Sequence, residues 1–244
     1  MTRPINFTGH GANVVGSLGS GSLVQDMPPA LSFDGDDYVL PTFTASRGVA
    51  STWTCWFKTD EWDTGRNGLM LTASEDMMVG VSDKDDDGKL YVGDFWGATT
   101  YRIRSQPLIS GTWNFVARTT DGAGGIKLYV NSYPVTSTTG QSTAGSAAVF
   151  SIGDRATQDK GFTGQIRDVR VFSSELDSDE VAEVQDDIVM AGTSVTPVHW
   201  YQMEEGTGVT AQDSGSSEDD GAINGATWVK DKYNLNQIGA GSVS

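Results

Sequence analysis

The stretch SDKDDDGKLYVGDF, from Ser82 to Phe95, has the spacing of a calcium-binding loop. Calcium takes about six to eight oxygen ligands, and alternating aspartates followed by a glycine can supply many of them from one short loop. In this interpretation the oxygens come from the side chains of Asp83, Asp85, Asp87 and Asp94 and from the backbone carbonyl of Lys89. The segment DDDGK equally suits the solvated tip of a β-hairpin. The pattern therefore leaves two interpretations open, a calcium site and a plain turn.

Aromatic side chains form the second group with a chemical use, because a sugar ring can stack on an indole or phenol ring. Trp62, Trp96 and Tyr101 fall on or near predicted loops, and they are candidate glycan contacts. Ordinary packing is the alternative explanation for these three residues. It is the preferred one for Trp53 and Trp113, which lie on faces predicted to point into the core.

Length and composition limit the classes of protein that the chain can belong to. Its 244 residues, 37% of them hydrophobic, suffice for one large β-sandwich or two small domains. The formal charge of −16 repels phosphates and anionic membranes, so nucleic acid is not an expected partner. No stretch approaches the roughly 20 apolar residues of a membrane helix, and membrane insertion is not expected either. The N-terminal residues lack an apolar core of signal-peptide length, so synthesis without export is the expectation.

Most of the chain alternates between apolar and polar residues in short runs that end at glycine- or aspartate-rich turns, which is typical of strands. One helix is expected, from Asp177 to Ile188, because Asp177 can cap it and Glu180 completes a capping box. A β-bulge is expected in FTGQIRDVRVF, since Ile166 is out of phase with Val169. These features predict an all-β protein with one short helix.

The chain divides by composition into three parts. Residues 1–30 are rich in glycine and serine, and we expect an extended N-terminal arm there. Residues 31–230 are expected to form one β-sandwich that includes a late strand element at residues 198–230. Residues 231–244 are expected to be a flexible tail.

Several segments taken together resemble the laminin-G-like domain of the concanavalin A-like lectin and glucanase superfamily. The resemblance spans about Leu31 to Val184 and rests on LSFDGDDYV, TWTCWFKTD, GTWNFVARTTDG, KLYVN and, above all, GFTGQIRDVRVFSSELDSDEVAEV. It implies a jelly roll of two curved antiparallel sheets, with a rim where related proteins bind calcium or sugars. The segment from His199 to Trp228 looks like the opening strand of the family, but here it follows the domain. Phage-encoded members of the superfamily carry a similarly displaced element.

The segment ELDSDE matches the carboxylate spacing of the glucanases in that superfamily, at Glu175, Asp177 and Glu180. A glycosidase needs its two carboxylates on either side of the scissile bond. Here the residues lie at the entry to a capped helix, where these positions do not share one face. The sequence therefore predicts a protein that is not an enzyme.

The expected function is a non-catalytic structural or adhesion protein on the surface of a phage virion. It would be a capsid decoration protein, a head fibre or a tail fibre, assembled in the host cytoplasm. The partners implied are other virion proteins, host glycans and further copies of the chain, and the implied cofactor is calcium. The alternative is an extracellular, calcium-dependent lectin-like domain, and a glucanase is the least favoured.

Overall fold

The structure is a computed structural model, and it describes residues 24–26, 29–62, 67–73, 77–83, 87–96, 100–155, 161–187, 190–230 and 232–234. The chain forms two compact units. One consists of Pro28–Lys230, and the other combines Met1–Met27 with Asp231–Ser244. In the smaller unit, β1 (Val24–Asp26) pairs with β19 (Lys232–Asn234) in an antiparallel ribbon.

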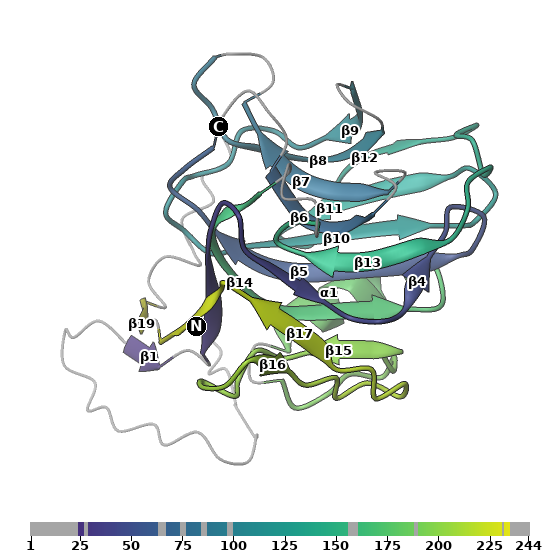
Figure 1. Cartoon of the computed structure of the whole chain (residues 1–244). Helices are drawn as coiled ribbons and strands as arrows, with labels where there is room; N and C mark the ends of the chain where they lie inside the picture. Colours follow the sequence, from purple (N-terminus) through teal and green to yellow (C-terminus); the bar gives the residue numbers. More distant parts are fainter. Residues whose placement is uncertain are drawn as a thin grey trace, which may run out of the picture. The chain divides into compact units, whose positions relative to one another are not determined.

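One sheet of the larger unit has eight strands, in the order β12-β11-β10-β5-β14-β2-β18, with β15 paired to β14 (Figure 1). These strands are β2 (Ala30–Asp34), β5 (Ser51–Lys58), β10 (Asn114–Thr120), β11 (Ile126–Val130), β12 (Tyr133–Thr138), β14 (Thr163–Phe172), β15 (His199–Tyr201) and β18 (Thr227–Val229). Every pairing between them is antiparallel.

The other sheet has nine strands, in the order β16-β17-β3-β13-β6-β7-β8-β9, with β4 paired to β13. These strands are β3 (Tyr38–Leu40), β4 (Thr44–Ala45), β6 (Asn67–Thr72), β7 (Met78–Ser82), β8 (Tyr91–Trp96), β9 (Thr100–Arg104), β13 (Ala148–Ile152), β16 (Thr210–Ala211) and β17 (Gly221–Asn224). The pairings are again antiparallel. Two antiparallel sheets, with one short helix among the described residues, confirm the predicted all-β jelly-roll sandwich.

The core lies between the two sheets and draws on the inward face of each. On β5 the side chains of Trp53, Cys55 and Phe57 are fully buried in it, as their alternation predicts. Trp113 is also buried, but it lies outside this core, and the guanidinium of Arg167 stacks over its ring. The prediction that Trp113 points into the core is therefore wrong. It failed because the outer face of this sheet is also covered, so a buried tryptophan can lie on either side.

The predicted bulge in β14 is confirmed, since the register with β5 shifts between Arg167 and Arg170. Asp168 lies within the bulge with φ near 50°. Its carboxylate accepts hydrogen bonds from Arg170 Nε and from Trp200 Nε1, each at 2.7 Å. The bulge therefore aims a buried carboxylate at β15 and ties that strand to β14.

The late strand element contributes to both sheets. Strands β15 and β18 pair with β14 and β2 in one sheet, while β17 pairs with β3 in the other. Tyr201, Met203 and Ala211 from this element are fully buried in the core. Trp200 lies on the opposite face of β15 from Tyr201, and the guanidinium of Arg170 stacks 4.3 Å from the centre of its ring.

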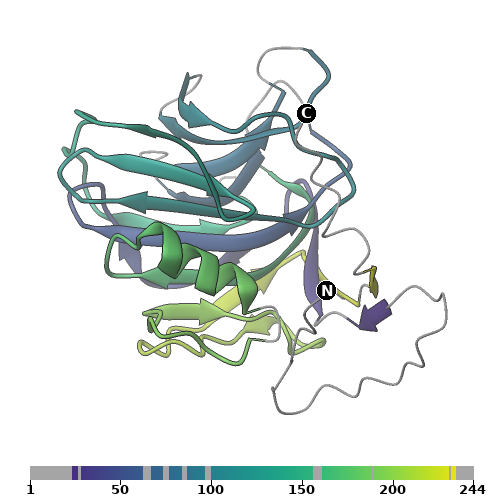
Figure 2. The same ribbon diagram turned by 180° about the vertical axis from the view of Figure 1, so that it is seen from behind.

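The helix α1 (Ser178–Asp186) lies against the strands of the eight-stranded sheet, as Figure 2 shows. Asp177 caps it by accepting hydrogen bonds from the backbone N–H groups of Asp179 and Glu180. The Glu180 carboxylate accepts in return from the Asp177 N–H, which completes the predicted capping box. Ile188, the expected last residue of the helix, lies outside the described residues. Within the described ranges, no helix is long and apolar enough to span a membrane.

Replacement of Asp177 by alanine is expected to lower the free energy of unfolding by about 1 kcal/mol, because the helix loses its N-cap. Urea denaturation followed by fluorescence measures this loss. Asp179→Ala is the matched control, since Asp179 is exposed in the same turn and its side chain makes no cap. Equal effects of the two changes would contradict the role of the capping box.

Candidate functional site

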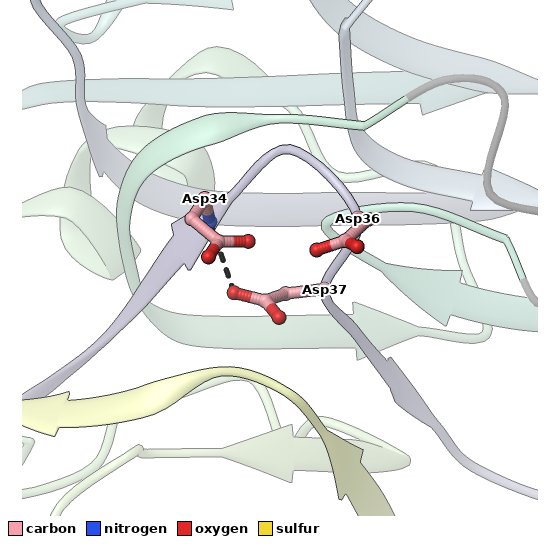
Figure 3. A group of neighbouring side chains, drawn as sticks. All are labelled: Asp34, Asp36 and Asp37. Carbon is pink, nitrogen blue, oxygen red and sulfur yellow. Dashed lines mark hydrogen bonds between the residues drawn. The ribbon is translucent and has the colours of Figure 1, made fainter.

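The turn between β2 and β3 carries a cluster of three carboxylates, from Asp34, Asp36 and Asp37 (Figure 3). One carboxylate oxygen from each of them lies within 4.8 Å of the others. Asp34 and Asp36 are exposed, whereas Asp37 is buried. Because β2 belongs to one sheet and β3 to the other, the turn crosses the rim of the sandwich.

Glycines at three positions let the backbone close tightly around this turn. Gly35 has φ of 109°, a conformation that other residues rarely adopt. A Cβ atom on Gly225 would lie 1.8 Å from Asp37 Oδ1, and a Cβ atom on Gly161 would lie 1.5 Å from the Gly35 carbonyl oxygen. The Asp34 N–H donates to Asp37 Oδ2 at 2.9 Å. The buried carboxylate is thereby held in a fixed position.

Mutual repulsion changes the acidity of the cluster. A hydrogen bond shared with the Asp34 carboxylate, together with its negative charge, raises the pKa of Asp36. Burial raises the pKa of Asp37, and the negative charges of Asp34 and Asp36 raise it further. The hydrogen bond from the Asp34 N–H has the opposite effect and lowers this pKa. A divalent cation would offset this repulsion, and carboxylate oxygens are the ligands that calcium prefers. These three residues are thus the ones best placed to hold a metal ion in the described part of the chain.

Calcium is expected to raise the melting temperature of the chain by several degrees at pH 7, because binding to the folded state stabilises it. Because the pKa values of Asp36 and Asp37 are raised, their ionised carboxylates destabilise the fold above these pKa values, and protonation removes this cost as the pH falls through them. Protons compete with calcium there, so the stabilisation should shrink between pH 7 and pH 4. Differential scanning fluorimetry with calcium or with a chelator measures both effects.

Two single variants test which acidic segment, if either, binds calcium. Asp36→Asn should abolish the response to calcium, and it should leave the fold intact because Asp36 is exposed. Asp87→Asn, in the loop that the sequence first indicated, should leave the response unchanged. The reverse outcome would assign the ion to the loop from Asp83 to Asp87.

In the described part of the loop from Asp83 to Asp87, the carboxylates accept hydrogen bonds from groups of the same hairpin. Asp83 accepts hydrogen bonds from the N–H groups of Asp87 and Gly88, at 3.0 and 2.8 Å. The Asp87 carboxylate accepts from Lys89 Nζ and from the Tyr91 hydroxyl, both at 2.8 Å, and these contacts lower its pKa to about 2. Asp85 lies outside the described residues. The geometry of Asp83 and Asp87 is that of a closed hairpin tip between β7 and β8.

Asp94 is not brought together with these residues. It lies opposite Val79 on β7, roughly 10 Å along the ladder from the end of that strand. Its Oδ1 accepts from Arg102 Nε and its Oδ2 from Arg118 Nε, and all three side chains are buried. Because β8 and β10 belong to different sheets, this carboxylate joins the two layers of the sandwich.

The candidate sugar contacts are placed as follows. Trp62 is half-buried and packs against the main core. Trp96 ends β8 and Tyr101 lies in β9, and their side chains are outside the described part of the structure. The prediction of a stacking role for these three residues remains a prediction.

The carboxylates with glucanase-like spacing all have structural partners. Asp177 and Glu180 form the capping box of α1, and Glu175 pairs with Lys127 at 2.9 Å. This arrangement does not present two carboxylates across a sugar-binding cleft, which glycoside hydrolysis requires.

A pocket of about 440 Å³ lies between β9 and β12. Its lining is largely polar, and the residues are Arg102, Ile103, Arg104, Gln106, Val135, Ser137 and Thr138. Neither this pocket nor the turn at Asp34–Asp37 was identified as a site from the sequence. The segment FDGDD does show three aspartates within four residues, which is a readable signal for the turn. The pocket has no such signal, since its residues come from separate segments.

Comparison with known proteins places the chain in a family. The family described as the Concanavalin A-like lectin/glucanases superfamily matches residues 33–182, and the chain belongs to this laminin-G-like family. Similar solved structures include a protein from Bacteroides ovatus whose assignment to carbohydrate binding is provisional, with a TM-score of 0.62 and 19% identity. The match covers 84% of this chain and 60% of that one, so the chain spans less than two thirds of that protein.

A second similar structure is the native heptameric SAP-like pentraxin from Limulus polyphemus. It has a TM-score of 0.54 and 17% identity, over 84% of this chain and 94% of the pentraxin. At these identities the two structures support the fold alone. The search of curated proteins finds no match to this chain.

Proposed function

We propose that the chain is a non-catalytic, lectin-like domain that binds carbohydrate, with calcium held at the turn of Asp34, Asp36 and Asp37. The superfamily contains two broad activities, lectins and glucanases. One observation carries the choice between them: the carboxylates with glucanase-like spacing cap a helix and pair with a lysine. The similarity to a protein provisionally assigned to carbohydrate binding supports the same choice.

The role of the calcium ion in this proposal is structural. The turn joins β2 of one sheet to β3 of the other, so an ion there would fix the rim of the sandwich. Loops that contact a ligand depend on such a fixed scaffold. Removal of calcium is therefore expected to weaken glycan binding together with thermal stability.

A printed glycan array, probed with the labelled chain in calcium and again in a chelator, tests the proposal. The expected result is retention on a limited set of glycans, with a weaker signal in the chelator. The absence of signal on every glycan, or the release of reducing sugar from a bound one, would overturn it.

A position on the surface of a phage virion is the setting that we propose for this binding. The pairing of Ala30 with Val229 supports it, because the chain enters and leaves the sandwich at adjacent strands. Segments from both ends of the chain also pair with each other in the ribbon of β1 and β19. Adjacent ends suit attachment through one side, to other virion proteins or to further copies of the chain.

Co-sedimentation of the chain with particles from a lysate of the cells that produce it tests this setting. Enrichment in the particle fraction is the expected result. A chain found only in the free fraction would contradict a virion role, while glycan binding would be unaffected.

A further inference from the structure

The pocket between β9 and β12 lies at the side of the sandwich where the two sheets end. Strand β9 is the last strand of one sheet, and β12 is the last strand of the other. The pocket volume of about 440 Å³ is in the range of small-ligand sites. Arg102, Arg104 and Gln106 line one wall, and Ser137 and Thr138 line the other.

Positive charge is concentrated beside this pocket, although the chain as a whole carries −16. Arg102 lines the pocket and shares the carboxylate of Asp94 with Arg118, so two guanidinium groups face one buried acid. Burial lowers the pKa of Arg102, and the positive charges of Arg118 and Arg47 lower it further. The negative charge of Asp94 has the opposite effect and raises this pKa. An anion in the pocket would stabilise these charges.

The guanidinium groups are held in place rather than loosely extended. Arg102 Nη2 donates to the Phe95 carbonyl oxygen at 3.0 Å, in addition to the bond between its Nε and Asp94. The guanidinium of Arg104 stacks 4.3 Å from the centre of the Tyr91 ring. Arginines fixed in this way lose little conformational freedom when they bind a carboxylate or sulfate group.

Residues that carry hydroxyl groups lie on the opposite wall. Ser137 and Thr138 line the pocket there, and a hydroxyl both donates and accepts hydrogen bonds, as the recognition of a sugar requires.

We propose that the pocket between β9 and β12 binds an acidic saccharide, with its carboxylate or sulfate group on Arg104 and with the charge of Arg102 adding to the attraction at the same wall. The inference rests on the proposed carbohydrate-binding function and names the class of ligand and the place where it binds. Non-specific attraction cannot produce such binding, because the net charge of the chain repels polyanions. At about 0.15 M salt this long-range repulsion is screened beyond roughly 8 Å, while contacts in the pocket persist.

Isothermal titration calorimetry with defined probes tests the inference. The acidic probes are trigalacturonic acid, which carries carboxylates, and a sulfated heparin disaccharide, and the neutral probe is maltotriose. At least one acidic probe should bind about tenfold more tightly than maltotriose, since a bidentate guanidinium contact is charge-assisted. The acidic probe that binds identifies the group, a carboxylate or a sulfate.

Two variants place the binding in the pocket. Arg104→Gln should lower the affinity of the chain for the acidic probe by about tenfold. Lys230→Gln changes the net charge by the same amount at an exposed position next to β18, at the opposite end of the sheet from β12, and it should weaken binding less than about twofold. Ser137→Trp, at an exposed position, should block the pocket without a change in melting temperature.

The possible outcomes separate this inference from the proposed function. If Arg104→Gln and Ser137→Trp bind the acidic probe as well as the parent does, the inference is overturned. If the parent binds neutral glycans but neither acidic probe, the inference fails and the lectin-like function stands. If the parent binds no glycan of any kind, both are overturned.

Discussion

A chain that ends at Thr196 is expected to be insoluble, or to melt far below the full chain. The change removes Tyr201 and Met203 from the core, and the burial of each is worth roughly 1.5–3 kcal/mol. It also removes the strands that pair with β14, β2 and β3, which leaves three unpaired strand edges open to aggregation. Since total stability is typically about 5–15 kcal/mol, the remaining sandwich should not persist.

The matched control is a chain that ends at Lys230. It loses Asp231–Ser244, the C-terminal segment of the smaller unit, and keeps every strand of the sandwich. Its melting temperature, followed by circular dichroism, should stay close to that of the full chain. A soluble chain ending at Thr196 with an unchanged melting temperature would show that the late element is an appendage.

Replacement of Asp94 by alanine is expected to cost about 3–5 kcal/mol, because it leaves buried charges without a partner. Both of its oxygens accept from arginines that are less than 5% exposed, at 4% for Arg102 and 1% for Arg118. Solvent contact at this exposure is too small to make up for the lost carboxylate. Urea denaturation should show a lower midpoint, or the variant should fail to fold.

The control for this variant is Asp87→Ala, which removes an aspartate from the same hairpin. Asp87 pairs with an exposed lysine, so solvent can replace the interaction and stability should change little. If both changes have the same small effect, the account of Asp94 as a link between the sheets is wrong.

The sequence was sufficient to predict those parts of the structure that depend on residues close together in the chain. The capping box at Asp177 and Glu180 and the bulge near Asp168 each depend on residues within a few positions of one another. The alternation in β5 likewise predicted which of its residues enter the core. The fold class follows from such local patterns because the same short strands and turns repeat along the chain.

The sequence was insufficient where a residue takes its role from distant segments. Asp94 completes a plausible calcium spacing, yet its partners come from β9 and β10, which no local pattern indicates. The three aspartates of FDGDD are visible in the sequence, but the crowding of their turn by Gly161 and Gly225 is visible only in the fold. The pocket between β9 and β12 is similarly a product of the way in which the two sheets end.

In the proposed function, the chain binds carbohydrate without altering it. The most direct measurement is a calorimetric titration of the glycan that gives the strongest array signal, followed by chromatography of the recovered glycan. We expect saturable binding, weakened by a chelator, and a glycan that is recovered intact. Two results would contradict this function. One is the absence of measurable heat with every glycan that gave a signal on the array, and the other is the recovery of cleaved glycan that appears only when the folded chain is present.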